Sequence, residues 1–591
     1  MRFRPAHRPA ALGRRTGLLR PLLAAAAALA MTGCDTGPPK VEQETADLVI
    51  WGGRIVTMDD AIPEVEALAA KDGRIVALGL RADIESRVGD ATEVVDLEGR
   101  LAIPGFVEAH AHFLSIGDAK IQLDLTVPER WEDVVDLVAE AVADAEPGTW
   151  IRGRGWHQDK WTEAPSPSFE GFPLHDALSA VSPDHPVLLT HASGHAAMVN
   201  AKAMELAGID DRTPDPPGGE ILRDASGRAT GLLNETAQGL IQDARGGEGQ
   251  APEAERLRMV ELASRECLSK GITSFHDAGS PFTDVDLLRR SADDGTLGIR
   301  LWMMVEGPNE ELAAKLAEYR LEDNGNQRLA VGGIKRYMDG ALGSRGAWLL
   351  EPYSDEPTTT GLALSEVDDL RETARLALEH RYQLAVHAIG DRANRQVLDL
   401  FSEAFEGHGG NGDLRWRIEH AQHIDPADLP RFAELGIIAS VQAVHATSDG
   451  PWVPERLGHE RSEAGAYPWR ALLDSGAVVI NGTDAPVEDV DPIANFYSSV
   501  TRRVADGTPF YPGQAMSRDE ALRSMTLDAA YGAFQEDLLG SLTVGKLADV
   551  TVLSKDILTV AEEELPTAEV VYTILGGEIA HRGSGDRGSG G

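Results

Sequence analysis

The sequence predicts an α/β protein built on a (β/α)8 TIM barrel. It also predicts a large insertion after the first barrel strand and a small β-sandwich domain made from both ends of the chain. Beyond residue 100 the chain alternates between apolar strands and helices; a helix beginning near Ser365, for example, leads directly into the strand 383–387. Such alternation predicts a parallel sheet, and eight strands close a barrel. The eight strands end at His110, Asp277, Val305, Asp339, His387, His420, Gln442 and Asp484.

Short β segments mark both ends of the chain. Residues 48–51, 55–58 and 74–78 are separated by Gly52-Gly53 and Asp72-Gly73, so we expect hairpins there. Near the C-terminus, strands at 548–553 and 570–575 precede Gly576-Gly577. Because the two ends of a domain often meet in space, residues 46–100 and 540–581 are expected to form one β-sandwich, which leaves 101–539 for the barrel.

Residues 114–245 exceed what eight barrel strands require. This segment contains Trp150, Trp156 and Trp161 and a further apolar run at 186–190. We expect it to form a lid or a pocket wall after the first strand. The alternative is that Leu188-Leu189 is itself a barrel strand, which would give nine strands and break the fold.

The N-terminus is typical of an export signal. Six arginines precede a short apolar run at 21–30, well below the roughly 20 residues of a membrane span. Met31-Thr32-Gly33-Cys34 resembles a bacterial lipoprotein cleavage site, so residues 1–33 are expected to be a signal peptide. Lipidated Cys34 would then anchor the protein on the outer side of the cytoplasmic membrane. An ordinary secretory signal is the alternative, and Arg14-Arg15 leaves twin-arginine export open.

Composition narrows the function. The 591 residues include 55 Lys+Arg and 95 Asp+Glu, and a formal charge of −40 argues against binding nucleic acid. Only Cys34 and Cys267 are present, which excludes a disulfide framework and a thiolate zinc site. Any metal must be bound by His, Asp, Glu or lysine-derived oxygens.

Residues 34–45 are expected to be a polar tether, and the Gly/Ser-rich tail 582–591 is expected to be disordered.

Several strand ends offer metal ligands. His110 and His112 lie at i and i+2 on one strand, so both side chains point to the same face and can bind one ion. Later strands present Lys335, His387, His420 and Asp484. In a barrel these ends open on the same C-terminal face, where the six groups can converge.

These motifs resemble the amidohydrolase superfamily, in the YtcJ-like branch that includes N-substituted formamide deformylases. The matching segments cover nearly the whole mature chain: Pro-Gly-Phe-x-x-x-His-x-His at 104–112, 271–279, Lys-x-x-x-Asp-Gly-Ala-Leu-Gly-Ser-Arg at 335–345, 387–394, 484–486 and 540–549. The resemblance implies that His110 and His112 bind a first divalent metal and that His387 and His420 bind a second. Lys335, as a carbamate formed with CO2, would bridge the two, and Asp484 would contact a metal and the attacking water. Such ligands suit zinc, with manganese or iron as the alternatives.

The resemblance further implies hydrolysis of a carbon–nitrogen bond other than a peptide bond, in an amide or N-acyl group such as N-formyl. Asp484 would move the proton, with His420 and Lys335 completing the catalytic set. A deaminase of the same superfamily is one alternative, but such enzymes place Glu three residues after the fifth-strand histidine, and here that position is Gly390, followed by Asp391. The second alternative is an inactive lipoprotein that only binds its substrate. A missing metal ligand would favour this alternative, but none of the expected ligands is missing.

The insertion also resembles the family, in Gly155-Trp156-x-Gln158-x-x-Trp161 and in 193–200, with His157 where many relatives have Asp. We expect substrate contacts from Trp156, Trp161, His195, Asp339, Arg345 and His445, with lid packing as the alternative for the insertion residues. His276 is expected to support the site rather than bind metal. An unmodified Lys335 paired with Asp339 is the alternative to the carbamate. The sequence does not determine the oligomeric state, and a homo-oligomer is compatible with it.

Overall fold

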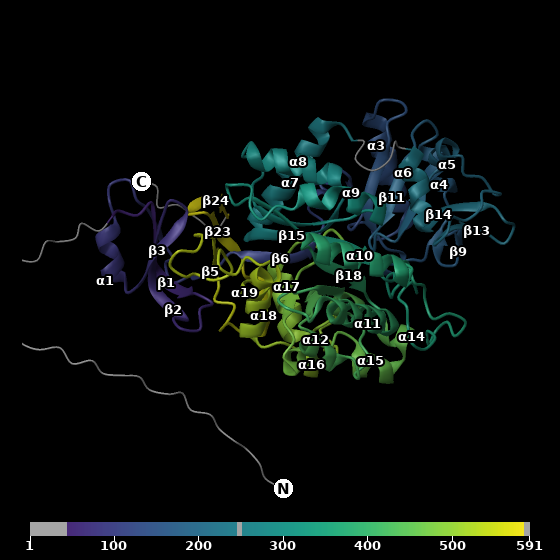
Figure 1. The fold of residues 1–591 in the computed structure, drawn as a ribbon. Coiled ribbons are helices and arrows are strands. Elements are labelled where there is room, and N and C mark those ends of the chain that lie inside the picture. The colour runs from purple at the N-terminus through teal and green to yellow at the C-terminus, as the bar shows by residue number, and fades with distance from the viewer. Residues whose placement is uncertain (1–43, 245–250, 584–591) are drawn as a thin grey trace, which may run out of the picture. The chain divides into compact units, whose positions relative to one another are not determined.

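The computed structural model describes residues 44–244 and 251–583 (Figure 1). The predicted signal peptide, Cys34 and nearly all of the tether lie outside the described residues, as does the tail beyond 583. Within the described ranges, no helix combines the length and the apolar composition needed to cross a membrane.

The central sheet is a nearly closed barrel of eight parallel strands, which confirms the predicted strand set. Neighbouring strands follow chain order from β6 through β15 to β21. Two backbone hydrogen bonds link the first and last strand ends: Asp484 N donates to His110 O (2.7 Å) and His112 N donates to Ala485 O (2.8 Å). The strands are β6 (Phe106–Ala111), β15 (Ile272–Ser280), β16 (Arg300–Val305), β17 (Leu329–Tyr337), β18 (Gln383–Ala388), β19 (Arg417–His420), β20 (Ile438–Val441) and β21 (Val479–Asn481).

Helices alternate with these strands, as their amphipathic patterns require. They include α8 (Phe282–Asp293), α9 (Asn309–Tyr319), α10 (Val367–His380), α11 (Asp391–His408), α12 (Leu429–Leu435) and α17 (Pro492–Thr501). In α10, Leu370, Ala374 and Ala377 are buried and Leu378 is half-buried, on the apolar face that the sequence pattern predicts. The expected cap at Ser365 is wrong: the helix begins after Glu366, and the Ser365 hydroxyl instead donates to Tyr337 O (2.6 Å).

Strands from both chain ends pair in one eight-stranded sheet. Its order is β24-β23-β22-β5-β1-β2-β3, with β4 paired to β1, so the predicted two-layer sandwich is not confirmed. β5 also belongs to this sheet because it pairs with β22 and β1, although the prediction began the barrel at residue 101. The strands are β1 (Leu48–Val56), β2 (Glu64–Lys71), β3 (Arg74–Gly79), β4 (Glu93–Asp96), β5 (Leu101–Pro104), β22 (Val550–Leu553), β23 (Val570–Leu575) and β24 (Glu578–Arg582).

Two of the three expected turns are present. Asp72-Gly73 joins β2 to β3 and Gly576-Gly577 joins β23 to β24, each with positive φ at both turn residues. The third expectation is wrong, because β1 continues through Gly52-Gly53 with a register shift between Trp51 and Ile55. A Cβ on Gly53 would lie 2.2 Å from Arg100 O, so glycine allows this close strand approach.

Between β6 and β15 the chain forms a separate six-stranded sheet, ordered β13-β14-β12-β11-β8-β7. The apolar run Val187–His191 is β11, which pairs with β8 and β12 and contributes no ninth barrel strand. The elements are β7 (Leu123–Asp124), α3 (Trp131–Asp144), β8 (Ile151–Trp156), β11 (Val187–His191), β12 (Ala196–Val199), β13 (Gly219–Arg223) and β14 (Ala229–Glu235). After this sheet, α7 (Glu253–Ser269) packs against α2 (Phe113–Ala119) on the way back to the barrel.

Candidate metal centre

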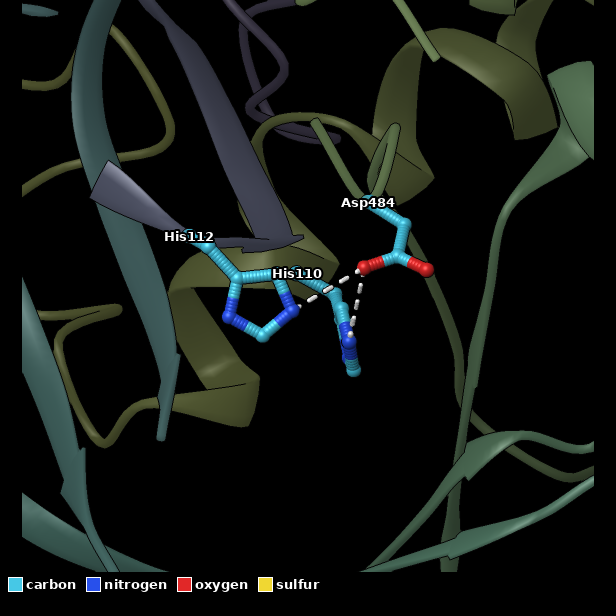
Figure 2. A group of neighbouring side chains, drawn as sticks. All are labelled: His110, His112 and Asp484. Atoms are coloured by element: carbon cyan, nitrogen blue, oxygen red, sulfur yellow. Dashed lines mark ion pairs between the residues drawn. The ribbon is translucent and has the colours of Figure 1, made fainter. Parts of the chain in front are cut away.

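The ends of the first and last barrel strands bring three ligand side chains together. His112 Nε2 lies 3.3 Å from Asp484 Oδ1, and His110 Nε2 lies 3.5 Å from the same oxygen. Figure 2 shows both imidazoles directed at this carboxylate oxygen. The two histidines come from β6 and its C-terminal end, as their spacing requires, and Asp484 follows β21.

A buried carboxylate that the sequence argument missed fixes this junction. Glu108 accepts hydrogen bonds from Thr483 N (2.8 Å), Thr483 Oγ1 (2.9 Å) and His110 N (3.0 Å). Gly482 is required beside it, because a Cβ there would lie 2.2 Å from Glu108 Oε1. Burial raises the pKa of Glu108 to about 7, against the lowering effect of these hydrogen bonds.

The other predicted ligands lie in the same cavity, which has a volume of about 2260 Å³. The rings of His387 and His420 are 4.4 Å apart between centroids, and those of His110 and His420 are 4.8 Å apart. Lys335 Nζ lies 3.5 Å from His110 Nε2. His445 joins them, with Nε2 4.0 Å from Asp484 Oδ2. The structure therefore gathers all six residues in one place although they are spread from 110 to 484 in the sequence.

The donor set fits a divalent cation. Within the part of the chain that the structure describes, His387 Nε2, His445 Nε2 and Asp484 Oδ1 are buried without a hydrogen-bond partner. Buried polar atoms without a partner are costly, and a cation would satisfy these lone pairs. His420 Nδ1 is hydrogen-bonded to Gln442 Oε1 at 2.7 Å, which leaves its Nε2 lone pair available.

The electrostatics also suit metal binding. Burial, reinforced by neighbouring cationic groups, holds the pKa values of His387 and His420 well below their ordinary range. Both imidazoles are therefore neutral, which is the form that binds metal. Burial alone would raise the pKa of Asp484, but the adjacent imidazoles of His110 and His112 hold it well below its usual value.

Lys335 is almost completely buried, and burial lowers its pKa against the opposing effect of surrounding carboxylates such as Glu419 and Asp484. Among the described residues, no ion pair joins Lys335 to Asp339. The Asp339 carboxylate instead accepts hydrogen bonds from the amides of Trp348 (2.7 Å), Ile389 (2.9 Å) and Gly390 (2.8 Å).

A second carboxylate missed by the sequence argument supports His110. Glu419 is fully buried and accepts a hydrogen bond from His110 Nδ1, which directs the His110 Nε2 lone pair toward Asp484 and the cavity. A sequence signal was available, because Arg417 and Glu419 place two charges in a strand that the barrel must bury. His276 lies below the site, fully buried and 3.3 Å from Arg417 Nη1.

Three of the expected substrate residues line the cavity, namely His195, Arg345 and His445. Three others do not. Trp156 is fully buried and donates to Leu189 O (2.9 Å), and Trp161 packs against it with ring centroids 5.9 Å apart, so both belong to the core of the insertion. Asp339 is completely buried, and its backbone hydrogen bonds orient the loop after β18, while burial raises its pKa to about 7.

The sequence is similar to several curated proteins over almost its full length. It is 34% identical to Protein LONG AFTER FAR-RED 3 of Arabidopsis thaliana, over 90% of this chain and 91% of that protein. It is 33% identical to the putative amidohydrolase YtcJ of Bacillus subtilis, over 90% and 99% of the two chains. It is 27% identical to the N-substituted formamide deformylase of Arthrobacter pascens, over 91% and 99%.

A solved structure shows the same fold. The crystal structure of an uncharacterized metal-dependent hydrolase from Pyrococcus furiosus is 29% identical, with a TM-score of 0.69, and the match covers 87% of this chain and all of that one. The sequence model of the amidohydrolase family matches residues 93–581, which include every strand of the barrel and every ligand described above. The chain is therefore a metal-dependent hydrolase and belongs to the amidohydrolase family.

Proposed function

We propose that this hydrolase cleaves carbon–nitrogen bonds other than peptide bonds, in amides or N-acyl groups such as N-formyl. The observation that carries the proposal is the cluster of His, Asp and Lys side chains at the C-terminal end of the barrel. Among the described residues, its His387 Nε2, His445 Nε2 and Asp484 Oδ1 are buried without a hydrogen-bond partner. Similarity to a protein named N-substituted formamide deformylase supports the choice of bond.

We assign one or two divalent cations, with zinc as the expected metal, to these side chains. His110 and His112 would hold the first cation and His387 and His420 the second, and Asp484 would contact a metal and the attacking water. A bound cation supplies a Lewis acid that activates water and polarises the carbonyl of the substrate. The imidazole-rich donor set with a carboxylate suits a catalytic zinc.

Lys335 is proposed to bridge the two cations as a carbamate. The neutral amine Nζ would attack CO2, forming an N–C bond and releasing one proton. Burial lowers the pKa of Lys335, which increases the fraction of neutral amine. Its position 3.5 Å from His110 Nε2 places the new oxygens within reach of the histidines.

Asp484 is proposed to move the proton. Its pKa is held low, so the carboxylate is ionised at neutral pH and can accept a proton from the attacking water and return it to the leaving nitrogen. His445 Nε2, 4.0 Å from Asp484 Oδ2, is placed to hold the same proton or to contact the substrate. His420 is held in one orientation by Gln442.

The loop after His387 argues against deamination. The position where related deaminases carry a glutamate is Gly390, and a Cβ there would lie 2.1 Å from Trp348 O. A larger side chain cannot occupy this position without moving the backbone. The chain therefore lacks the space as well as the residue for that acid.

The test compares wild type with Asp484→Asn on a panel of N-formyl, N-acetyl and cyclic amides. An amide cannot act as a base at neutral pH, so we expect kcat to fall about 10²- to 10⁴-fold while most of the bound metal remains. A kcat within a few-fold of wild type would assign proton transfer elsewhere, with His445 next. If metal-loaded wild type cleaves no carbon–nitrogen bond in the panel, the proposal fails.

We also propose that the protein is exported and anchored by a lipid on Cys34, on the outer side of the cytoplasmic membrane. The support is the sequence pattern alone: a basic segment, a short apolar run and the small residues Thr32 and Gly33 before Cys34. The enzyme would then bind its small-molecule substrate outside the cytoplasm.

A further inference from the structure

Five arginines line the cavity, and one of them differs from the rest. Four have a carboxylate partner: Arg152 pairs with Asp118 (2.6 Å) and Glu255 (2.8 Å), Arg256 with Asp284, Arg345 with Asp355 (2.8 Å), and Arg456 also with Asp355. Arg154 is the exception, because no described carboxylate lies within ion-pair distance of its guanidinium. The cavity therefore contains one arginine whose charge has no direct protein counter-ion.

Arg154 lies on β8, where the insertion meets the metal centre. Its Nε donates to Pro486 O (3.3 Å), two residues after Asp484, and its Nη2 donates to Ala192 O (3.3 Å). Both terminal nitrogens lie beside Gly194, where a Cβ would be 3.7 and 3.8 Å from them. The two carbonyls account for two of the five guanidinium N–H groups, so three remain for a ligand.

The charge on Arg154 is compensated only at longer range. The carboxylates of Asp484 and Asp118 oppose the lowering of the Arg154 pKa by burial. Asp118 is already paired with Arg152, and Asp484 lies between His110 and His112. A cation bound at the metal centre would take up the charge of Asp484 as well. A half-buried guanidinium left in this state is costly unless an anion completes it.

We propose that Arg154 binds a carboxylate of the substrate, so that the preferred amides carry a carboxylate close to the scissile carbon–nitrogen bond. The planar guanidinium can bind a carboxylate through two parallel hydrogen bonds. Its contact with Pro486 fixes the distance between this anion site and the loop that carries Asp484. The inference rests on the proposed amide hydrolysis for its reaction, but the anion site itself can be tested by binding alone.

The binding test uses the metal-loaded protein and two ligands with the same carbon skeleton, the anionic 3-phenylpropionate and the neutral 3-phenylpropionamide. Calorimetry should show that wild type prefers the carboxylate. Arg154→Gln should weaken carboxylate binding about 10- to 100-fold, as expected for losing hydrogen bonds to a charged group, and change amide binding less than about 3-fold. Arg154→Lys should retain part of the preference because it keeps the charge. An undiminished carboxylate preference in Arg154→Gln would overturn the proposal.

Arg152→Gln is the matched control. Arg152 is two residues earlier on β8 and lines the same cavity, but it is paired with carboxylates. Its replacement should affect the two ligands equally. A specific loss of carboxylate binding in this variant would assign the anion site to Arg152 instead. Inorganic phosphate provides the last comparison, since Arg154-dependent binding of phosphate in preference to 3-phenylpropionate would refute the carboxylate assignment.

Turnover separates this inference from the proposed function. N-formylphenylalanine and N-formyl-2-phenylethylamine differ only by the carboxylate. In Arg154→Gln, kcat/KM should fall for the first and remain within about 3-fold for the second. Equal losses on both would make Arg154 a clamp between the insertion and the Asp484 loop, and the inference would fail while amide hydrolysis stands. If wild type cleaves neither amide yet binds the carboxylate through Arg154, the proposed reaction fails and the anion site stands.

Discussion

Glu419→Gln should weaken metal binding without removing any metal ligand. The glutamate is completely buried and accepts the Nδ1 hydrogen bond of His110, itself only 1% exposed. Burial acts to raise the pKa of Glu419, but His110, Arg417 and Lys335 outweigh it and lower the pKa to about 2. The carboxylate is therefore charged at neutral pH. Glutamine preserves the shape of the side chain and one acceptor oxygen but removes the charge that makes the His110 imidazole a better donor.

The expected loss is about 10- to 100-fold in zinc affinity, the usual effect of removing a partner of a ligating histidine. At about 1.4 kcal/mol for each factor of ten, this corresponds to about 1.4–2.8 kcal/mol. The change should be confined to the cation proposed to bind at His110 and His112, because His420 is oriented separately by Gln442. Where two cations bind, only one of the two dissociation constants should rise.

Competition with a chromogenic chelator measures the zinc dissociation constants directly. Glu520→Gln is a suitable control, because it removes a carboxylate far from the metal ligands that is paired with Arg470. It should leave the zinc dissociation constants unchanged. Zinc binding by Glu419→Gln within about 3-fold of wild type would refute the argument that this buried charge supports His110.

Three further predictions test the centre, the electrostatics and the export signal. His110→Ala combined with His112→Ala should remove most of the bound metal, measured by elemental analysis, and all activity; full turnover by the metal-stripped double variant would contradict the metallohydrolase assignment. Hydrogen bonding to Arg470 lowers the pKa of Glu520 to about 2, so its contribution to stability is present above its unfolded pKa and is lost as the pH falls toward 2. Because Glu520 is about one-third exposed, we expect Glu520→Gln to cost only about 1 kcal/mol at pH 7 in denaturant unfolding, with the difference vanishing near pH 2; a difference that persists there would exclude this cause. Cys34→Ser should prevent lipidation and normal processing, and mass spectrometry showing an unmodified wild-type N-terminus elsewhere than Cys34 would refute the lipoprotein assignment.

The amino-acid sequence by itself determined the barrel and the gathering of its candidate ligands. Barrel strands are covered on both faces, so they appear as continuous apolar runs; β16 and β18 are buried at every position. Once these runs are known to be parallel, their C-terminal ends must lie together. His110 and His387 are therefore expected at the same end of the barrel without any knowledge of their contacts, and each lies beside His420. The turns at Asp72-Gly73 and Gly576-Gly577 could also be predicted from the sequence. Each depends on residues that adopt positive φ, and not on contacts with distant segments.

Only the tertiary structure decided what each polar or aromatic side chain touches. Trp156 and Trp161 were expected in the substrate pocket, yet they pack in the core of the insertion. Asp339 was expected to contact substrate, but it accepts hydrogen bonds from the backbone amides of Trp348, in the loop that follows it, and of Ile389, 50 residues away. Glu419 was missed because its partner is 309 residues away. Local sequence patterns indicate which face of a helix or strand is apolar. The residue that a side chain contacts depends on how distant segments of the chain pack together. The burial of the contact then determines whether it stabilises the fold, shifts a pKa or binds a ligand.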